Sequence, residues 1–284
     1  MSKLKKELQK IIDLSLAEDC ALKDVTSDLT IPKNHEISFS IRPREEIILC
    51  GIDAIKICFD SLKRSKKFAN SKLKLKTLAK DGYSIKPLES ISEGKGDARL
   101  IFAAERVILN LIQHLSGVST NTRQFTKLLA SKNTKILDTR KTIPTLRALE
   151  KYAVTVGGGK NHRINLSDMI LIKDNHIAAA GGVTKAINAA KKSHKKLKIE
   201  IECDNLKQVS EALLSKPDII MLDNMNVAQI KQAQKIINKK CLIEISGGIN
   251  LQNIKNFIDL EVDFISIGAI THSARAVDIG LDIY

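Results

Sequence analysis

The sequence predicts an α/β protein whose larger part is a parallel α/β barrel, either complete or incomplete. After about residue 105, short apolar segments alternate with helical ones, and this order with short loops favours parallel β-α units. The last four predicted strands end at Glu202, Asp223, Ser246 and Gly268, at intervals of 21, 23 and 22 residues. That regular repeat favours a barrel. A doubly wound sheet is the alternative, but no glycine-rich fingerprint follows an early strand as a dinucleotide-binding fold requires.

The first hundred residues predict a smaller α+β unit. An amphipathic helix over residues 4–16 is followed by half-exposed strands at 37–41 and 73–76, where apolar and polar residues alternate. A helix over residues 51–62 lies between these strands, and Asp81-Gly82 indicates a turn. We expect an N-terminal sandwich domain over residues 1–104 and a barrel domain over residues 105–271.

The barrel region opens with a long predicted helix. Apolar residues recur at helix spacing from Glu105 to Leu129, and Gly117 indicates a break or a close helix contact. The strands that follow are short runs rich in Ile and Leu. They are residues 136–138, 169–172, 199–201, 219–222, 242–245 and 264–267.

The composition is that of a soluble protein, with 43% hydrophobic and 27% charged residues. No apolar run approaches the roughly 20 residues of a membrane span. The charged N-terminus does not lead into a signal peptide, so we expect a cytoplasmic protein without a membrane partner. The net charge of +14 fits small polyanionic substrates, an acidic partner or solvated lysine-rich faces. With 4% aromatic residues and no Trp, base stacking is disfavoured, and we expect no nucleic-acid partner.

The cysteines predict neither a zinc site nor a disulfide framework. The five are scattered and form no C-x-x-C pair, which suits a reducing compartment. We expect them to be small buried residues. They are Cys20, Cys50, Cys58, Cys203 and Cys241.

Each predicted barrel strand ends in polar residues or glycine, and active sites of such barrels lie at the carboxyl ends of the strands. One such residue would mean little, but six successive ends converge on one mouth. Cationic and hydroxyl groups dominate, and each could instead pair with surface acids. Together they favour a substrate with several negative charges, since arginine offers a planar fork for carboxylate or phosphate. These residues are Thr139, Arg140, Lys141, Lys173 and, from the glycine loop at 157–163, His162 and Arg163.

Two small-residue segments after the last strands predict a phosphate site. They are Ser246-Gly247-Gly248 and Ile267-Gly268-Ala269, where barrels commonly bind phosphate through backbone N–H groups. Tight turns are the alternative.

Glu202 and Asp223 are the acids at these otherwise basic strand ends. Carboxylates beside a phosphate site repel the ligand unless they hold a metal ion or ribose hydroxyls. Mg²⁺ held by these acids and by substrate phosphates is therefore the expected cofactor. In the alternative, the two acids neutralise Lys173 and Arg163.

Several motifs resemble the quinolinate phosphoribosyltransferase family (carboxylating nicotinate-nucleotide pyrophosphorylases). The resemblance covers nearly the whole chain, and its longer motifs are specific. The matching segments are residues 16–19, 24–27, 96–99, 136–142, 146–154, 157–163, 171–177, 221–225, 246–248 and 281–283.

The resemblance implies a type II phosphoribosyltransferase fold, which is an open, incomplete TIM-like α/β barrel with an N-terminal α+β sandwich. It implies that residues 272–284 return to the N-terminal domain and that the protein is a homodimer or larger assembly. Arg106 matches the family arginine that reaches the neighbouring subunit's site. The resemblance also places the pyridine dicarboxylate among basic residues and the 5′-phosphate at the two glycine segments. The basic residues are Arg140, Lys141, His162, Arg163 and Lys173.

The activity implied is transfer of phosphoribose from phosphoribosyl pyrophosphate to quinolinate, with loss of CO2, in NAD biosynthesis. Lys141, Glu202 and Asp223 are the expected catalytic residues: the lysine neutralises pyrophosphate and an acid stabilises the developing sugar cation. Three alternatives remain. They are a paralogue acting on another small anion, such as the molybdenum-associated pyrophosphorylase-like proteins, a nicotinate phosphoribosyltransferase, and a basic nucleic-acid-binding module.

Overall fold

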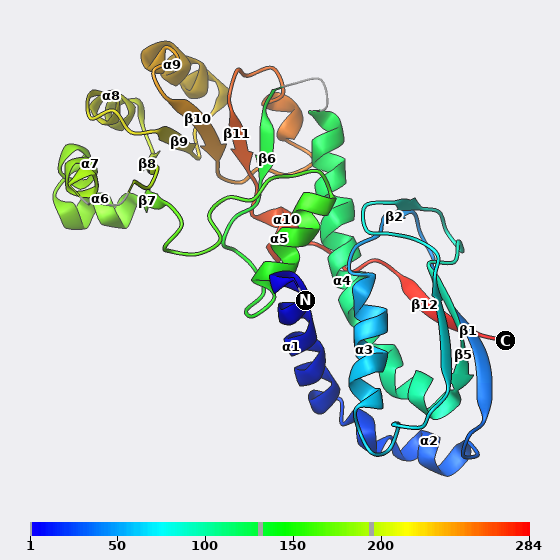
Figure 1. The fold of residues 1–284 in the computed structure, drawn as a ribbon. Coiled ribbons are helices and arrows are strands. Elements are labelled where there is room, and N and C mark those ends of the chain that lie inside the picture. The colour runs from blue at the N-terminus through cyan, green and yellow to red at the C-terminus, as the bar shows by residue number, and fades with distance from the viewer. Residues whose placement is uncertain (1, 130–132, 193–195) are drawn as a thin grey trace. The chain divides into compact units, whose positions relative to one another are not determined.

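The computed structural model describes residues 2–129, 133–192 and 196–284, and the chain forms two compact units (Figure 1). The first unit comprises residues 1–123, 142–158 and 273–284, and the second comprises 124–141 and 159–272. The boundary expected after residue 104 falls inside α4, one helix from Ala98 to Leu128. This helix begins before Glu105 because the Asp97 carboxylate accepts a hydrogen bond from the Arg99 N–H at 3.0 Å and caps the first turn.

The first unit contains a four-stranded antiparallel sheet in the order β12-β1-β5-β3. The predicted strands at 37–41 and 73–76 are confirmed as β1 and β3. The C-terminal strand β12 pairs with β1, with Ile283 opposite Phe39. A separate ribbon joins β2 and β4. The strands are β1 (Glu36–Pro43), β2 (Ile47–Ile48), β3 (Leu73–Thr77), β4 (Ser84–Ile85), β5 (Ser92–Asp97) and β12 (Ile279–Ile283).

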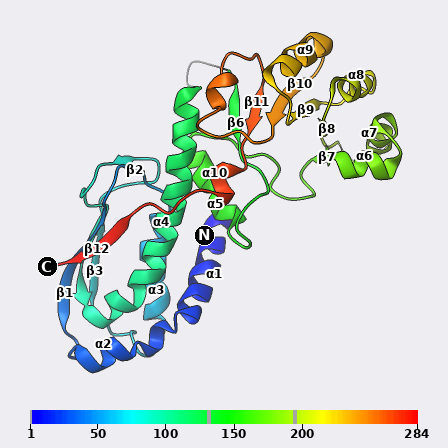
Figure 2. The same ribbon diagram turned by 180° about the vertical axis from the view of Figure 1, so that it is seen from behind.

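Helices cover this unit's core. The amphipathic N-terminal helix is confirmed as α1, which buries Leu8, Ile11 and Ile12 and packs against α3 and α5 (Figure 2). Gly117 in α4 marks a close approach to the C-terminal segment rather than a helix break, because a Cβ there would overlap the Arg275 carbonyl oxygen. The helices are α1 (Lys3–Glu18), η1 (Ala21–Lys23), α2 (Val25–Thr30), α3 (Asp53–Lys63), α4 and α5 (Arg147–Val156).

The second unit contains a parallel sheet of six strands in the order β6-β11-β10-β9-β8-β7, which confirms the six predicted barrel strands. Within the described residues no ladder joins β6 to β7, so the barrel is open. Helices α7, α8 and α9 lie along one side of the sheet (Figure 1). The strands are β6 (Lys135–Leu137), β7 (Ile170–Ile172), β8 (Ile199–Cys203), β9 (Ile219–Asp223), β10 (Leu242–Ser246) and β11 (Phe264–Ser266). The helices are α6 (Asp174–Ala180), α7 (Val183–Lys191), α8 (Leu206–Leu214), α9 (Val227–Ile237), η2 (Ile254–Asn256) and α10 (Ala269–His272).

Among the described residues, no helix is both long and apolar enough to cross a membrane. All five cysteines are free thiols, but the prediction that they are buried is wrong for Cys20, which is exposed in a turn after α1, and for the half-buried Cys241.

Candidate functional site

The parallel register of the second unit brings the predicted strand-end residues to one edge of its sheet. Ser246 at the end of β10 lies opposite Asp223 at the end of β9. On β8, Glu202 lies opposite Met221, which is two residues before Asp223 on β9. Because strands in a parallel sheet all run the same way, their carboxyl ends share one edge.

Asp138 fixes the glycine loop to β6. This carboxylate, fully buried at the end of β6, accepts the His162 N–H at 2.9 Å. Lys160 adds a parallel bridge to Leu137, with its own N–H donated to the Ile136 carbonyl at 2.8 Å. The loop carrying His162 and Arg163 is thus held at the strand end by backbone and side-chain bonds together.

Two buried glutamates from β8 and β10 meet His162 in the interior of the second unit. The His162 Nε2 lies 3.0 Å from Glu200 Oε2 and 3.6 Å from Glu244 Oε1, and both glutamates are fully buried. Ser266 on β11 donates its hydroxyl to Glu244. Burial raises the pKa of Glu200 to about 7 and that of Glu244 to about 8; the neighbouring Glu200 charge raises the pKa of Glu244 further.

The cationic groups predicted from the sequence are concentrated here. Burial lowers the pKa of the half-buried Arg163 guanidinium, and the positive charge of Arg140 lowers it further, whereas Glu200 acts in the opposite direction. Two like charges placed close together are unfavourable until an anion arrives. The pair therefore favours a ligand that carries carboxylate or phosphate groups.

The acids expected at a metal site also come together. Oxygen atoms of Glu202, Asp204 and Asp223 lie within 4.8 Å of one another, a set of hard ligands that fits Mg²⁺. Lys173, which precedes α6, donates from Nζ to Glu202 at 2.6 Å. The alternative that Glu202 neutralises Lys173 is therefore observed, and the carboxylate group as a whole still fits a hydrated Mg²⁺.

The segment at 246–248 is shaped by Asn224. Asn224, with a φ of 52°, donates its backbone N–H to the Ser246 carbonyl at 2.9 Å and its side-chain amide to Asp223. Gly247 has a φ of 101°, and a Cβ on it would overlap the Asn224 side-chain oxygen. At Gly248, with a φ of 60°, a Cβ would meet nothing within 4 Å, so this backbone borders open space.

Gly247→Ala is expected to lower stability by about 2–5 kcal/mol, combining the strain of a positive φ with overpacking against Asn224. Gly248→Ala is the matched control, because it adds the same methyl at a positive φ without a clash and should cost about 1–2 kcal/mol. Urea unfolding of both variants measures the difference. Equal midpoints would show that the Asn224 contact does not shape this segment.

Lys141 and His272 flank the second glycine segment. A Cβ on Gly268 would lie 3.1 Å from the Lys141 Cδ and 3.2 Å from the His272 ring. Thr271 Oγ1 donates to the Lys141 carbonyl at 2.7 Å, while the Lys141 N–H donates to Thr139 Oγ1 at 3.1 Å. These contacts place the stem of Lys141 beside the expected phosphate segment.

Ile267 and Ala269 complete that segment. The Ile267 side chain is buried, and its N–H donates to the Leu137 carbonyl at 3.0 Å. Ala269 begins α10, so Gly268 and Ala269 offer the small-residue backbone of this segment.

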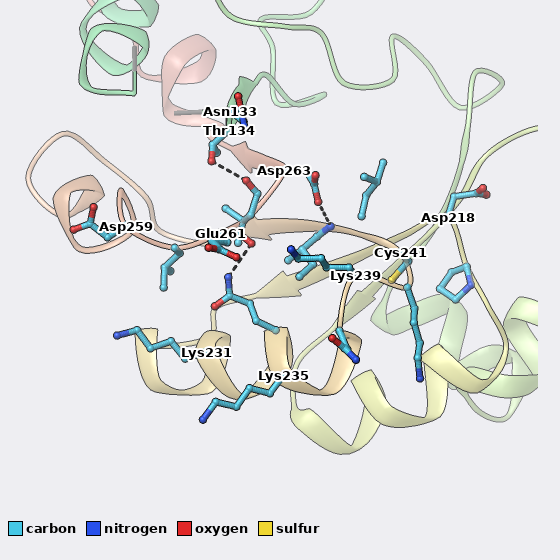
Figure 3. Close-up of a pocket in the computed structure, with 18 of the residues that line it drawn as sticks. Asn133, Thr134, Asp218, Lys231, Lys235, Lys239, Cys241, Asp259, Glu261 and Asp263 are labelled. Carbon is cyan, nitrogen blue, oxygen red and sulfur yellow. Dashed lines mark hydrogen bonds between the residues drawn. The ribbon is translucent and has the colours of Figure 1, made fainter. Parts of the chain in front are cut away.

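A hollow of about 1510 Å³ lies at the opposite, amino-terminal ends of the strands (Figure 3). Two of its acids have structural partners: Asp218 accepts the Ile199 N–H at 2.7 Å and Asp263 accepts the Ile243 N–H at 2.8 Å, so both cap strand starts. The lysines around it, such as Lys231 and Lys235, belong to α9. Because active sites of α/β barrels lie at the other end of the strands, this hollow is not the candidate site.

Comparison with known proteins decides the family. The chain matches the N-terminal domain of quinolinate phosphoribosyl transferase over residues 24–116 and its C-terminal domain over residues 118–282. The chain belongs to the quinolinate phosphoribosyl transferase family. It is 43% identical to a probable carboxylating nicotinate-nucleotide pyrophosphorylase of Methanocaldococcus jannaschii, covering 99% of this chain and 98% of the relative. It is 38% identical to the carboxylating nicotinate-nucleotide pyrophosphorylase of Mycobacterium leprae, covering 92% and 91%.

A solved structure agrees with this result. The nicotinate-nucleotide pyrophosphorylase of Ehrlichia chaffeensis is 41% identical and superimposes with a TM-score of 0.92, covering 100% of this chain and 99% of that one. The open α/β barrel with an N-terminal sandwich, expected from the resemblance, is therefore confirmed as the quinolinate phosphoribosyl transferase fold.

The second unit contains all but one of the site residues predicted for this family. Residues from β6, the glycine loop and the ends of β7 to β11 belong to it. Arg106 belongs to the first unit, where it is exposed on α4. Its expected reach into a neighbouring subunit's site stays a prediction.

Sequence reasoning missed several residues that shape this candidate site. Asp138 was recognised only as a strand end, although a buried acid beside a glycine loop is a typical loop anchor. Polar residues at i and i+2 of a strand share one face, so Glu200 could have been paired with Glu202. No comparable pattern marks the remaining ones. The missed residues are Asp138, Glu200, Asp204, Asn224, Glu244 and His272.

Proposed function

We propose that this chain converts quinolinate and phosphoribosyl pyrophosphate to nicotinate mononucleotide, pyrophosphate and CO2, a reaction of NAD biosynthesis. The observation that carries this proposal is the pairing of Arg140 with Arg163 beside a sheet edge that also offers two small-residue backbone segments. A dicarboxylate suits the arginine pair, and phosphate groups suit the glycine backbone. The names of the relatives, which are nicotinate-nucleotide pyrophosphorylases, support the same reaction.

The reaction needs no covalent nucleophile from the protein. The pyridine nitrogen of quinolinate attacks C1 of the ribose while the bond from C1 to the pyrophosphate oxygen breaks. The electron pair leaves with pyrophosphate, whose growing charge the Lys141 ammonium neutralises. A carboxylate of Glu202 or Asp223 stabilises the positive charge that develops on the sugar. Orienting two charged reactants supplies much of the rate enhancement, up to about 7–11 kcal/mol in ideal cases.

Decarboxylation follows from the alkylated ring. Once the ring nitrogen is positively charged, the bond between C2 and its carboxylate breaks, CO2 leaves, and the electron pair stays on C2. A proton then replaces the carboxylate. Arg163 and Arg140 would hold the second carboxylate, which is retained in the product, and so keep the ring in place during both steps.

The proposed cofactor is Mg²⁺, held by Glu202, Asp204 and Asp223 together with substrate phosphates. When bound, the ion neutralises charge on the pyrophosphate. We expect a chelator to abolish turnover and added Mg²⁺ to restore it.

The proposal includes a homodimer or larger assembly in the cytoplasm. Five free thiols, of which Cys50, Cys58 and Cys203 are buried, suit a reducing compartment.

The exposed position of Arg106 leaves it available to a second subunit. Mixing inactive Arg106→Ala subunits with inactive Lys141→Ala subunits should restore activity if Arg106 serves a neighbouring site. No restoration on mixing would contradict that role.

The direct test incubates the purified chain with phosphoribosyl pyrophosphate, Mg²⁺ and either quinolinate or nicotinate. Quinolinate should give nicotinate mononucleotide and CO2 in equal amounts, and nicotinate should give neither. Turnover of nicotinate instead, or no product from a folded sample, would overturn the proposal and favour a related reaction on another anion.

A further inference from the structure

Glu200 and Glu244 form a buried cluster with His162, and the reaction described above gives these two glutamates no role. The atoms of this cluster come from three separate elements: the glycine loop, β8 and β10. Ser266 on β11 adds a hydroxyl that donates to Glu244. Burying two carboxylates is costly unless they are neutralised, paired or hydrogen-bonded.

The hydrogen bond at Nδ1 of His162 identifies the tautomer of the ring. The Arg163 N–H donates to His162 Nδ1 at 2.7 Å, so Nδ1 is an acceptor and the ring proton lies on Nε2. Nε2 in turn faces Glu200 Oε2 at 3.0 Å and Glu244 Oε1 at 3.6 Å. A metal ion in this cluster would require the opposite tautomer, in which Nδ1 donates and Nε2 has a free lone pair. This tautomer therefore places a proton, and not a free lone pair for a metal ion, on Nε2 facing the two glutamates.

The ring also determines where the next residue lies. His162 is held through its own N–H by Asp138 at 2.9 Å and through Nδ1 by the backbone of Arg163, and its Nε2 lies 3.0 Å from Glu200 Oε2. Its side chain is only 7% exposed. A change at Nε2 would therefore be transmitted through the rigid ring to the backbone N–H of Arg163, whose guanidinium belongs to the anion site.

We propose that Glu200 and Glu244 are positioning residues that hold the His162 ring as its Nε2–H tautomer and thereby place Arg163 for the pyridine substrate. The His162 ring thus connects the buried acids of β8 and β10 to the backbone of the glycine loop. The kinetic part of this inference rests on the proposed function, because it is measured with quinolinate. The tautomer part does not, since it is measured on the protein without substrate.

The tautomer is tested by nitrogen NMR of the chain labelled at histidine. The His162 resonances are assigned by their loss in His162→Asn. In the wild type they should report a protonated Nε2 and an unprotonated Nδ1 at neutral pH. A doubly protonated ring, or a proton on Nδ1, would overturn the proposal even if the enzyme proved inactive on quinolinate.

The positioning role is tested by a pair of variants at Glu244. Glu244→Leu keeps the volume and removes the acceptor, so the KM for quinolinate should rise roughly 10- to 100-fold while that for phosphoribosyl pyrophosphate stays the same. Glu244→Gln keeps an acceptor oxygen for His162 and a partner for Ser266, and should recover most of the lost affinity. Ile245→Ala, the next residue on β10, is the control for a buried change on the opposite face of the strand from Glu244.

The outcomes separate positioning from simple packing. An equal loss in Glu244→Gln and Glu244→Leu, or a rise in both KM values, would contradict the proposal. If Glu244→Leu does not fold, Ser266→Ala removes the hydroxyl donor to Glu244 and should raise the quinolinate KM in the same direction by a smaller factor. An unchanged quinolinate KM in Ser266→Ala would then count against it. A wild-type enzyme that makes no product refutes the proposed function and leaves the NMR result to decide the tautomer.

Discussion

Arg163→Ala is expected to lower kcat/KM for quinolinate by about 100- to 1000-fold, because it removes a half-buried guanidinium beside Arg140. A charge-assisted hydrogen bond contributes about 1.5–3 kcal/mol, and a guanidinium can make two to one carboxylate. The KM for phosphoribosyl pyrophosphate should change little, since the glycine segments remain intact. Steady-state kinetics with each substrate varied in turn measures both effects.

Two further variants show whether geometry or charge matters at this position. Arg163→Lys keeps the positive charge but loses the planar fork, and should fall between the wild type and Arg163→Ala. Arg64→Ala removes a guanidinium that pairs with Asp13 on the surface of the first unit, and should leave the kinetics unchanged. Wild-type kinetics in Arg163→Ala would refute the assignment of the anion site.

Glu244→Gln is expected to flatten the dependence of stability on pH. Burial raises the pKa of Glu244 to about 8 from an ordinary value of 4.5, so between these pH values the folded chain binds more protons than the unfolded chain. Stability therefore falls as the pH rises through this window, by at most about 1.4 kcal/mol per pH unit for one such group. Glutamine does not titrate, so the variant should be more stable than the wild type above about pH 8, where the buried wild-type carboxyl is charged.

Thermal unfolding midpoints measured at about pH 6 and about pH 9 test this prediction. Between those values the wild-type midpoint should fall further than that of the variant. Glu261→Gln, which removes an exposed carboxylate of the same unit, is the control and should follow the wild type. Parallel profiles for Glu244→Gln and wild type would show that this carboxyl is not the source of the slope.

The strands, and the polar residues at their carboxyl ends, could be predicted because each depends on local sequence. The apolar runs ending at Glu202, Asp223 and Ser246 follow from burial on both faces of a parallel sheet, and the polar end of each run marks where the strand leaves the core. The glycine segments were recognisable for the same reason. At Gly247 the structure adds the cause, which is the close approach of Asn224.

The buried part of the site could not be predicted from local sequence. Alternation in the β8 sequence Ile-Glu-Ile-Glu-Cys has the same period whether the glutamates face solvent or the sheet interior. In the interior, Glu200 and Glu244 meet His162, which comes from a loop distant in sequence. The start of α4 was likewise placed late, because the capping role of Asp97 depends on its hydrogen bond to Arg99.

A crystal structure of the chain with quinolinate tests the central claim most directly. The claim is that the carboxyl ends of the barrel strands bind the pyridine dicarboxylate through Arg163 and Arg140. We expect the ring beside these guanidinium groups, with its nitrogen directed toward the edge that carries Asp223 and Gly248. Quinolinate in the hollow beside Lys231 and Lys235 at the opposite ends of the strands, with the arginine pair unoccupied, would contradict it.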